Sequence, residues 1–529
     1  MDNRTKRIEI FDSTLRDGSQ GEGISFSVKD KLNIVKALDE FGISYIEAGN
    51  PGSNPKDLSF FEALKNIKLK NSKICAFGST VRPGIDVSID NNVINLLKAD
   101  TEVVSIFGKT WDMHVEKVLK ITLEQNLQLV EDTISYLKSK GKEVIFDAEH
   151  FFDGFKANKN YALKVIAAAI VGGADTICLC DTNGGTLPQE IEKITKFIVE
   201  RFPDKKIGIH CHNDIGCGVA NSVSAVLGGA VQVQGTFIGF GERCGNATLS
   251  TIIADLTLKC GYDCGVKLES LKRTARRIAE ISNFRIRSNL PYVGESAFAH
   301  KGGMHIDAVQ KIPQSFEHID PSLVGNERRF LVSEVSGRGT VLPRLQKFVP
   351  DADKNSKETE KITQIMKERE LFGYQYEAAE ASFELLMMKE LNLWTPPFKI
   401  KGYEVRDRYP SIDGEQSIAT VEIEVDGSCE YSTDVGNGPV NAVDKAIRKI
   451  LCKHYPEIEK MFMSDIKVRF IEMGVTTDAK IRVLIESTDE SSVFTTIGVS
   501  TDIVGASCTA LIESFEYEFA KKEKINDKD

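Results

Sequence analysis

Short runs of β-branched and apolar residues alternate with longer amphipathic stretches along the first half of the chain. Successive runs begin roughly 25 to 40 residues apart, a spacing typical of strand and helix units. Eight runs follow this pattern: IEIF at Ile8, YIEAG at Tyr45, KICAF at Lys73, VVSIF at Val103, VIFDAE at Val144, TICLCD at Thr176, IGIHCH at Ile207 and VQVQGTF at Val231. Alternating strands and helices predict a parallel sheet, and eight units predict a closed (β/α)8 TIM barrel. An open doubly wound sheet is the alternative.

The pattern changes after residue 267. Residues 268–397 are predicted to be helical with irregular connections, and this segment ends in LWTPPF, where Pro396 and Pro397 cannot continue a helix. In residues 398–529, the alternating runs IATVEIEV and KIRVLIES each lead toward a glycine-containing turn and an amphipathic helix. We therefore expect three parts: a barrel over 1–267, a helical linker subdomain over 268–397 and a separate α+β domain over 398–529.

Two histidines at the end of the seventh run, His210 and His212, are separated by one residue. Residues i and i+2 of a strand face the same side, so both imidazoles point into the barrel or both point outward. Inward-facing imidazoles at the carboxyl end of a barrel strand would form half of a metal site, whereas a pair of core histidines is the alternative. Cys211 between them faces the opposite way and is expected to be a packing residue.

Oxygen donors come from DSTLRDG after the first run and GERCGNA after the eighth. Together with imidazoles they favour a catalytic divalent ion with open positions, and they do not choose among magnesium, manganese and zinc. Arg16 next to Asp17 supplies a fixed cation suited to a carboxylate or an enolate-like oxygen. Cys178 and Cys180 also share a strand face, but without a second cysteine pair they are expected to pack as small apolar residues.

Charge and composition exclude several classes of protein. A net charge of −10 and a pI near 5.6 argue against a nucleic-acid-binding protein, which needs clustered lysine and arginine. No apolar run is long enough to cross a membrane, and the first residues, MDNRTKRIEIF, lack the apolar core of a signal peptide. The 11 cysteines lack a disulfide framework and are typical of reduced thiols. We expect a cytoplasmic protein without nucleic-acid or membrane partners.

Three motifs carry a family resemblance. DSTLRDGSQ, IHCHNDIG and GERCGNATL closely resemble signatures of the 2-isopropylmalate, homocitrate and citramalate synthases, whose barrels are related to hydroxymethylglutaryl-CoA lyase. The resemblance extends from about Ile8 to Phe519, and CDTNGGTLP and SAFAHKGGMH look most like the long citramalate synthase branch. It implies a metal site made of Asp17, His210, His212 and Asn246.

The resemblance also implies substrate contacts. Arg16 would touch the 2-oxo acid, and Glu149 and Thr182 would contact or position substrate. The segment matching GGMHID would reach over a barrel from the partner subunit of a homodimer, which makes His305 the candidate base and Asp307 its orienter. Two positions depart from the family pattern: Asn50 replaces a bulky aromatic residue, and Phe316 replaces a tyrosine.

The activity implied by the resemblance is a metal-dependent Claisen-type condensation of acetyl-CoA with pyruvate, followed by thioester hydrolysis, in isoleucine biosynthesis. Phe77 and Phe107, if they line the pocket, favour a small acceptor. Synthesis of 2-isopropylmalate or homocitrate is the alternative within the family. Cleavage of an acyl-CoA by a lyase and a non-catalytic amino-acid sensor are alternatives from other classes.

The C-terminal modules resemble the regulatory domain of the same family. We expect a branched-chain amino acid to bind where two helices begin, at Gly438 and Pro439 in GNGPVN and at Gly505 and Ala506 in DIVGAS. Helix N-termini present free N–H groups that bind a carboxylate. A domain that serves dimerisation alone is the alternative.

Overall fold

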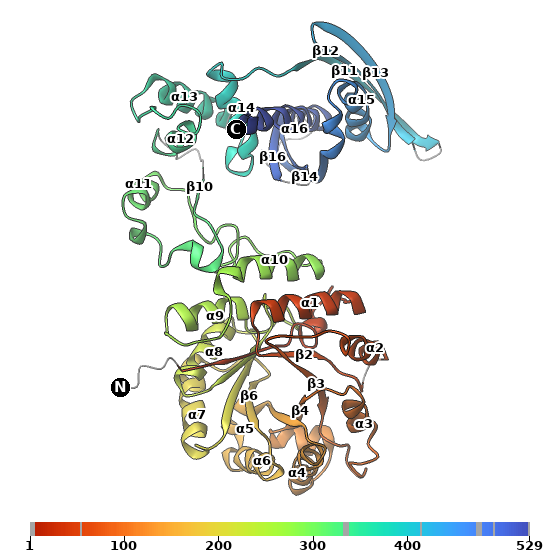
Figure 1. Ribbon diagram of the computed structural model, residues 1–529, viewed down its shortest axis with the longest axis vertical. Coiled ribbons are helices and arrows are strands. Elements are labelled where there is room, and N and C mark those ends of the chain that lie inside the picture. The colour runs from red at the N-terminus through yellow and green to blue at the C-terminus, as the bar shows by residue number, and fades with distance from the viewer. Residues whose placement is uncertain are drawn as a thin grey trace. The chain divides into compact units, whose positions relative to one another are not determined.

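A computed structural model shows two compact units in the chain (Figure 1). It describes residues 6–52, 55–331, 338–412, 415–471, 479–489 and 492–526. The first unit comprises Met1–Phe298 and Ile319–Arg328, and the second comprises Ala299–His318 and Arg329–Asp529. The boundaries predicted at residues 267 and 397 stay predictions.

Eight parallel strands of the first unit close into a barrel in sequential order. They are β1 (Glu9–Asp12), β2 (Tyr45–Gly49), β3 (Lys73–Ser79), β4 (Val103–Lys109), β5 (Glu143–Glu149), β6 (Thr176–Asp181), β7 (Lys206–Cys211) and β8 (Gln232–Gly235). Closure is completed by β1 and β8, with Phe11 opposite Gln234. The predicted TIM barrel is therefore confirmed, and the open doubly wound sheet is excluded.

Helices surround the barrel, as Figure 1 shows. They are α1 (Val28–Phe41), α2 (Pro55–Leu64), α3 (Asn91–Lys98), α4 (Leu123–Ser139), α5 (Phe151–Ala157), α6 (Lys159–Gly172), α7 (Pro188–Arg201), α8 (Gly218–Leu227), α9 (Leu249–Leu258) and α10 (Leu271–Ile281). Local signals set several of their ends. The side chain of Ser27 accepts a hydrogen bond from Asp30 N–H in a capping box that begins α1, and Gly42 ends this helix in the left-handed conformation.

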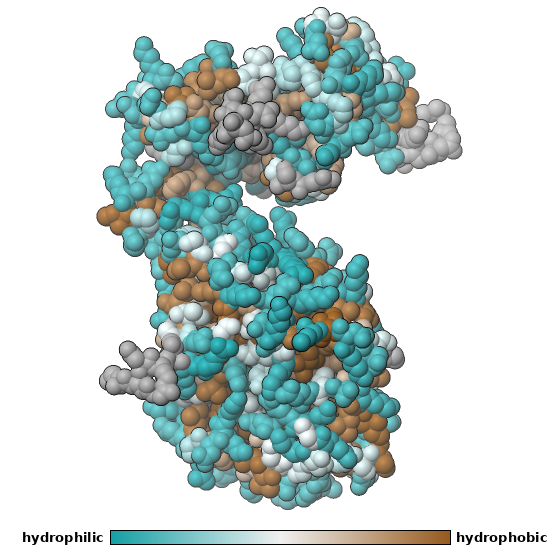
Figure 2. All heavy atoms as spheres, in the orientation of Figure 1, coloured by the Kyte–Doolittle hydropathy of each residue, from teal (hydrophilic) through white to brown (hydrophobic). Residues whose placement is uncertain are grey.

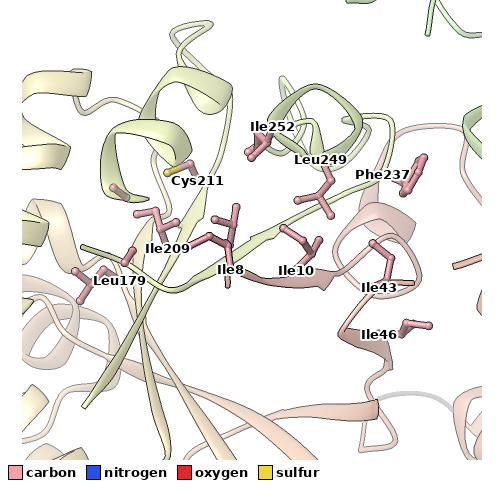
Figure 3. Packing of buried hydrophobic residues seen from close by; sticks show 14 of the residues in the cluster. Ile8, Ile10, Ile43, Ile46, Leu179, Ile209, Cys211, Phe237, Leu249 and Ile252 are labelled. Atoms are coloured by element: carbon pink, nitrogen blue, oxygen red, sulfur yellow. The ribbon is translucent and has the colours of Figure 1, made fainter. Parts of the chain in front are cut away.

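Strand alternation separates an apolar outer layer from a polar interior. Ile209 and Cys211 of β7 belong to the buried layer between strands and helices, together with Ile10 and Leu249 (Figure 3). Cys211 is thus a packing residue, as predicted. The intervening His210 faces the interior, because successive side chains of a strand point to opposite faces. Most of the core is apolar, so the inward polar residues at the carboxyl ends of the strands stand out.

The second unit combines helices with two three-stranded antiparallel sheets. Its elements are β9 (Ala299–His300), α11 (Gly303–Lys311), β10 (Arg329–Phe330), α12 (Arg338–Leu345), α13 (Lys357–Leu371), α14 (Glu380–Glu390), β11 (Phe398–Ile412), β12 (Glu415–Val425), β13 (Ser428–Gly436), α15 (Pro439–His454), β14 (Phe462–Phe470), β15 (Ile481–Thr488), β16 (Val493–Ser500) and α16 (Ile503–Asn526). The helix α15 packs on the β11–β13 sheet and α16 on the β14–β16 sheet. The predicted C-terminal α+β architecture is confirmed, and β11, β13, β14 and β16 are strands that the pattern did not predict.

The face of the molecule seen in Figure 2 is mainly hydrophilic. On the face seen in Figure 2, apolar residues are scattered among polar ones in both units. Within the described part of the chain, no helix is sufficiently long and apolar to traverse a bilayer. All eleven cysteines are free thiols.

Candidate active site

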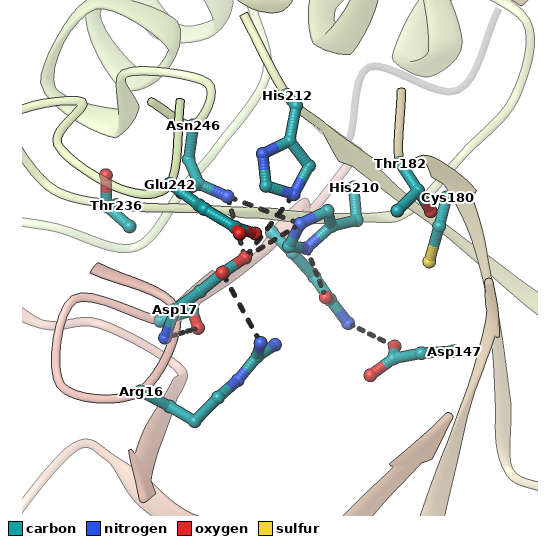
Figure 4. A network of polar contacts seen from close by, with 12 residues as sticks. Arg16, Asp17, Asp147, Cys180, Thr182, His210, His212, Thr236, Glu242 and Asn246 are labelled. Carbon is teal, nitrogen blue, oxygen red and sulfur yellow. Dashed lines mark hydrogen bonds and ion pairs between the residues drawn. The ribbon is translucent and has the colours of Figure 1, made fainter. Parts of the chain in front are cut away.

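The four predicted metal ligands meet at the carboxyl end of the barrel (Figure 4). Asp17 Oδ2 lies 3.2 Å from His210 Nε2 and 3.7 Å from His212 Nε2. The side-chain amide nitrogen of Asn246 donates a hydrogen bond of 2.8 Å to the same oxygen. All four side chains are buried. Both imidazoles therefore point into the barrel, and the sequence-predicted set comes together around one carboxylate.

The loop after β8 places Asn246 next to the end of β7. His212 and Asn246 form an isolated antiparallel bridge, and Ala247 N–H donates to the Cys211 carbonyl at 2.9 Å. A Cβ atom on Gly241 would lie only 1.9 Å from Asn246 Oδ1. The same loop needs Gly245, which has a φ of +88° and no room for a Cβ atom beside the Gly239 carbonyl. The glycines of GERCGNA thus allow the close approach that positions the amide.

Charge distribution favours an ionised Asp17 beside a neutral His212. Burial opposes ionisation of Asp17, but the Arg16 charge and the adjacent His210 imidazole hold the pKa of Asp17 well below its ordinary value. Burial and the neighbouring His210 lower the pKa of His212 to about 4. His212 is therefore neutral at physiological pH and has a nitrogen lone pair to offer.

These residues fit a divalent cation. Ligand atoms of Asp17, His210 and His212 all lie within 4.8 Å of one another. Among the described residues, Asn246 Oδ1 is a buried oxygen without a hydrogen-bond partner, and a half-turn of the amide exchanges this oxygen with the nitrogen now facing Asp17. One carboxylate, two imidazoles and an amide oxygen form a ligand set suited to magnesium, manganese or zinc.

A second group of potential ligands consists of Asp147, Cys178 and Cys180. The two oxygens of Asp147 already accept hydrogen bonds from Ser105 and Gln234. Burial raises the pKa of the Cys178 thiol well above its ordinary value, which disfavours the thiolate that a metal requires. Cys178 and Cys180 belong to the buried barrel interior, in keeping with the predicted packing role.

Arg16 is fixed by three contacts on one side of the site. Its Nε donates to Glu47 Oε2 at 2.6 Å, and an Nη atom lies 3.5 Å from Asp17 Oδ1. Its guanidinium carbon lies 3.7 Å from the centre of the Phe77 ring. The charge of Arg16 is thereby held beside the ligand carboxylate without having to reorganise.

A buried polar network, which the sequence motifs did not predict, continues from Glu47 across the barrel. Ser105 Oγ lies 3.1 Å from Glu47 Oε1 and 2.6 Å from Asp147 Oδ2. Gln234 Nε2 donates to Asp147 Oδ1 at 3.1 Å, and Gln234 Oε1 lies 3.0 Å from His210 Nδ1. Each of these polar residues interrupts an apolar strand on the inward face, and this was the signal available in the sequence.

A cavity of about 250 Å³ opens beside the four candidate metal ligands. It is lined by Arg16, Asp17, Gln20, Phe77, Phe107, Asp147, Glu149, Cys180, Thr182, His210, His212 and Glu242. Phe77 and Phe107 stack with their ring centroids 5.5 Å apart, so the predicted pocket-lining positions are confirmed. Glu149 forms an ion pair with Lys109. The backbone N–H of His150 donates to Thr182 Oγ1 at 2.9 Å, which leaves the hydroxyl proton of Thr182 free to donate elsewhere.

His305 and Asp307 lie on α11 of the second unit. The His305 ring stacks on Phe316 with centroids 4.1 Å apart. Asp307 pairs with Lys311 at 2.5 Å and with Lys354 at 2.8 Å. Side chains two positions apart on a helix do not face each other, so α11 does not itself bring the Asp307 carboxylate to His305. Their roles as base and orienter stay predictions.

The positions predicted to bind an effector lie at the starts of α15 and α16. Gly438 precedes Pro439 at the start of α15, where no side chain caps the helix. At α16, the Asp502 carboxylate accepts hydrogen bonds from the N–H groups of Val504 at 3.2 Å and Gly505 at 2.6 Å. A ligand carboxylate at this helix start would therefore compete with a group of the same charge, and the start of α15 is the more open of the two.

Comparisons with known proteins agree with this geometry. A family model described as HMGL-like matches residues 7–278, and a model of the LeuA allosteric (dimerisation) domain matches residues 377–518. The homocitrate synthase post-HMGL domain-like model matches residues 292–370. The chain is 50% identical to an (R)-citramalate synthase of Aquifex aeolicus over 98% of this chain and 99% of the relative. The chain belongs to the citramalate synthase family.

Other relatives place the chain within this family. It is 48% identical to the (R)-citramalate synthase of Geobacter sulfurreducens over 98% of both proteins. Identity to a 2-isopropylmalate synthase of Shewanella oneidensis is 31%, over 96% of this chain and 94% of the relative. These two citramalate synthases are thus more similar to the chain than this sister enzyme is, and the predicted branch is confirmed.

Proposed function

We propose that the chain is an acyltransferase that condenses acetyl-CoA with pyruvate and hydrolyses the resulting thioester to (R)-citramalate and CoA, in isoleucine biosynthesis. The observation that carries this proposal is the meeting of Asp17, His210, His212 and Asn246 beside Arg16 in one cavity. The family membership supports the same reaction. A Claisen-type condensation needs a polarised ketone, a base and a compensating positive charge.

Asp17, His210, His212 and Asn246 would hold a divalent ion, magnesium, manganese or zinc. When bound, such an ion supplies Lewis-acid polarisation of the 2-oxo group. Arg16, held by Glu47 and Phe77, would bind the acid and stabilise negative charge that develops on the ketone oxygen. Because the arginine is fixed before substrate arrives, this stabilisation requires little reorganisation.

The remaining lining residues would orient and select the acceptor. Thr182, whose oxygen is already satisfied by His150 N–H, can donate its hydroxyl proton to the acceptor's carboxylate. Glu149 would position substrate from the end of β5. The stacked rings of Phe77 and Phe107 occupy the wall of a small cavity, which favours a methyl group over the longer side chains of other 2-oxo acids.

The base is proposed to be His305, supplied to the barrel by the partner subunit of a homodimer with Asp307 as its orienter. An imidazole has an ordinary pKa near neutrality and can remove the acetyl methyl proton. The stacking of His305 on Phe316 defines its ring plane. His305→Ala should abolish turnover while leaving metal binding unchanged, because the proposed ligands all come from the barrel.

The direct test measures CoA release with pyruvate, 2-oxobutyrate, 2-oxoisovalerate and 2-oxoglutarate after exchange into defined divalent ions. We expect the highest kcat/KM with pyruvate. A preference for 2-oxoisovalerate or 2-oxoglutarate would assign the chain to a sister activity, and no turnover with any acid would refute the synthase. His210→Ala should lose activity, whereas the control His454→Gln changes a histidine that pairs with Glu430 in the second unit.

The C-terminal region is proposed to form a homodimer and to bind a branched-chain amino acid. The LeuA allosteric (dimerisation) domain match supports both roles. The start of α15, at Gly438 and Pro439, is the favoured position for the effector carboxylate. The start of α16, at Gly505 and Ala506, is the second candidate position. Gly438→Phe, introduced where a Cβ meets open space, should weaken inhibition by isoleucine without changing uninhibited turnover. Light scattering tests the dimer.

We also propose a cytoplasmic location. All eleven cysteines are free, which suits a reducing compartment. Fractionation of cells that express the tagged full-length chain tests this location, and recovery with the membrane pellet would contradict it.

A further inference from the structure

The side-chain amide of Gln234 bridges a metal-ligand histidine and a buried carboxyl group. Its Oε1 lies 3.0 Å from His210 Nδ1, and its Nε2 donates to Asp147 Oδ1 at 3.1 Å. His210 and Gln234 are direct partners in the pairing of β7 with β8, whereas Asp147 belongs to β5, so the amide reaches across the barrel interior. All three residues are buried. In Figure 4, dashed lines run from the labelled His210 ring and from the labelled Asp147 carboxyl group, the two groups that this amide joins.

The two contacts fix which atom of the amide faces which neighbour. Asp147 Oδ1 is an acceptor both in the ionised carboxylate and in a carboxyl group protonated on Oδ2, so the amide nitrogen of Gln234 faces it and donates. The amide oxygen must then face His210, where it can accept but not donate. His210 Nδ1 therefore carries a proton, and in neutral imidazole the other nitrogen, Nε2, has the lone pair. This Nε2 is the atom 3.2 Å from Asp17.

The far end of the bridge is anchored as well. Ser105 Oγ lies within hydrogen-bond distance of both Glu47 Oε1 and Asp147 Oδ2, although a hydroxyl has only one proton. If Asp147 is protonated on Oδ2, it donates to Ser105, which donates to Glu47, and every contact is satisfied. Burial, followed by the charge of Glu47, raises the pKa of Asp147 to about 6, in the direction that this arrangement requires. The orientation of the Gln234 amide thus has support from both sides.

We propose that Gln234 is a positioning residue that holds His210 in the Nδ1–H tautomer, with Nε2 free to bind the divalent cation. His212 provides the internal contrast, because its Nδ1 is buried without a hydrogen-bond partner among the described residues. The inference rests on the proposed metal site and adds to it a residue outside the ligand set. Partners of this kind typically change metal affinity by about 10-fold to 100-fold.

The chain offers a matched control on the same strand. Gln232 lies two residues before Gln234, is equally buried, and neither atom of its amide has a hydrogen-bond partner in the described structure. Gln234→Met and Gln232→Met remove the same groups from the same strand face. We expect Mn²⁺ affinity, measured by paramagnetic resonance on the metal-free full-length chain, to fall about 10-fold to 100-fold for Gln234→Met and to stay unchanged for Gln232→Met.

A spectroscopic measurement reads the tautomer directly. The chain has 8 histidines, and ¹⁵N imidazole spectra of the metal-free protein distinguish a protonated Nδ1 from a protonated Nε2. In its neutral form, His210 should carry its proton on Nδ1 in the unaltered protein, whereas in Gln234→Met the proton should exchange between the two ring nitrogens. Assignment of its signal comes from His210→Ala. A neutral His210 that carries its only proton on Nε2 in the unaltered protein would overturn the inference.

A second pair of variants protects the test against misfolding of Gln234→Met. Asp147→Asn keeps a donor for Ser105 and an acceptor for Gln234, so Mn²⁺ affinity should be retained. Asp147→Leu removes both the donor and the acceptor, so its Mn²⁺ affinity should fall as far as that of Gln234→Met. Equal affinity in all variants would refute the role of Gln234. Failure of the unaltered chain to bind Mn²⁺, Mg²⁺ or Zn²⁺ would instead refute the proposed metal centre.

Discussion

Asn246 donates a 2.8 Å hydrogen bond to Asp17 although 229 positions separate the two residues in the sequence. The contact exists because β8 pairs with β1 and closes the barrel, which brings the loops after these two strands together. Formation of the site therefore depends on closure of the entire barrel. Unfolding of either the first or the last strand should abolish metal binding before it affects the second unit.

Replacement of the amide ligand should weaken the metal site specifically. Asn246→Leu removes the only amide of the proposed set while Asp17, His210 and His212 remain, and we expect at least about a tenfold loss of Mn²⁺ affinity. Equilibrium titration of the metal-free protein measures this loss. Asn183→Leu alters an exposed asparagine on the neighbouring loop and serves as the control. Equal affinities of the two variants would remove Asn246 from the ligand set.

Arg16→Lys should impair the chemical step more than binding of the metal. A lysine retains the charge but cannot contact Glu47 through a planar guanidinium while stacking on Phe77. We expect kcat with pyruvate to fall about 100-fold or more, with metal content unchanged. Steady-state kinetics and metal analysis of the same preparation test both statements. A variant with wild-type kcat would show that charge alone suffices.

Thr182→Val should raise the KM for pyruvate, because it removes the hydroxyl donor that His150 orients. A lost hydrogen bond to a carboxylate corresponds to about a 10-fold to 100-fold increase in KM. Thr182→Ser keeps the hydroxyl and should restore most of the affinity. If serine and valine behave alike, the threonine serves packing and does not contact the acid.

Stability should fall as pH rises through the titration of Asp12. Burial raises the pKa of this carboxyl to about 7, above its ordinary value of 3.8. The folded state therefore holds a proton that the unfolded chain releases between these pH values, so the stabilisation is complete below about pH 4 and lost above about pH 7. Thermal melting at about pH 5 and about pH 8 measures the slope.

Asp12→Asn should remove this slope while keeping the acceptor for Thr14 N–H, which now bonds to Asp12 Oδ1 at 2.9 Å. The difference between the two pKa values corresponds to at most about 4 kcal/mol of unfolding free energy. The exposed Asp204, changed to asparagine, is the control. A pH dependence of Tm that persists unchanged in Asp12→Asn would contradict the assignment.

The barrel was predictable because its strands are short, buried and regularly spaced, and its ligands follow the strand ends. The strand β14 was missed because all nine of its residues are exposed. Without a buried face, its sequence need not alternate between apolar and polar residues. The strand β11 contains many charged residues, which also obscure the alternation of apolar and polar residues that predicts a strand. Local sequence pattern does not report pairing with a distant strand, which is what stabilises both.

The candidate site was also predicted only in part. His210 and His212 were found because their spacing alone places them on one strand face. Gln234 and Asp147 were missed because single polar residues in apolar strands do not indicate their partners, and those partners lie on β7, β8 and β5. Only barrel closure and the register of the strands determine that the amide reaches both.

Crowding around the GERCGNA loop limits how the enzyme can be re-engineered. Since a single added carbon at Gly241 would collide with the Asn246 amide, variant libraries that diversify this loop to admit bulkier acceptors would mostly return proteins that have lost their cation. Phe107 lines the same cavity without being a proposed ligand, whereas Phe77 supports Arg16. Altered acceptor scope should therefore be sought by shortening the Phe107 ring while Phe77 is kept.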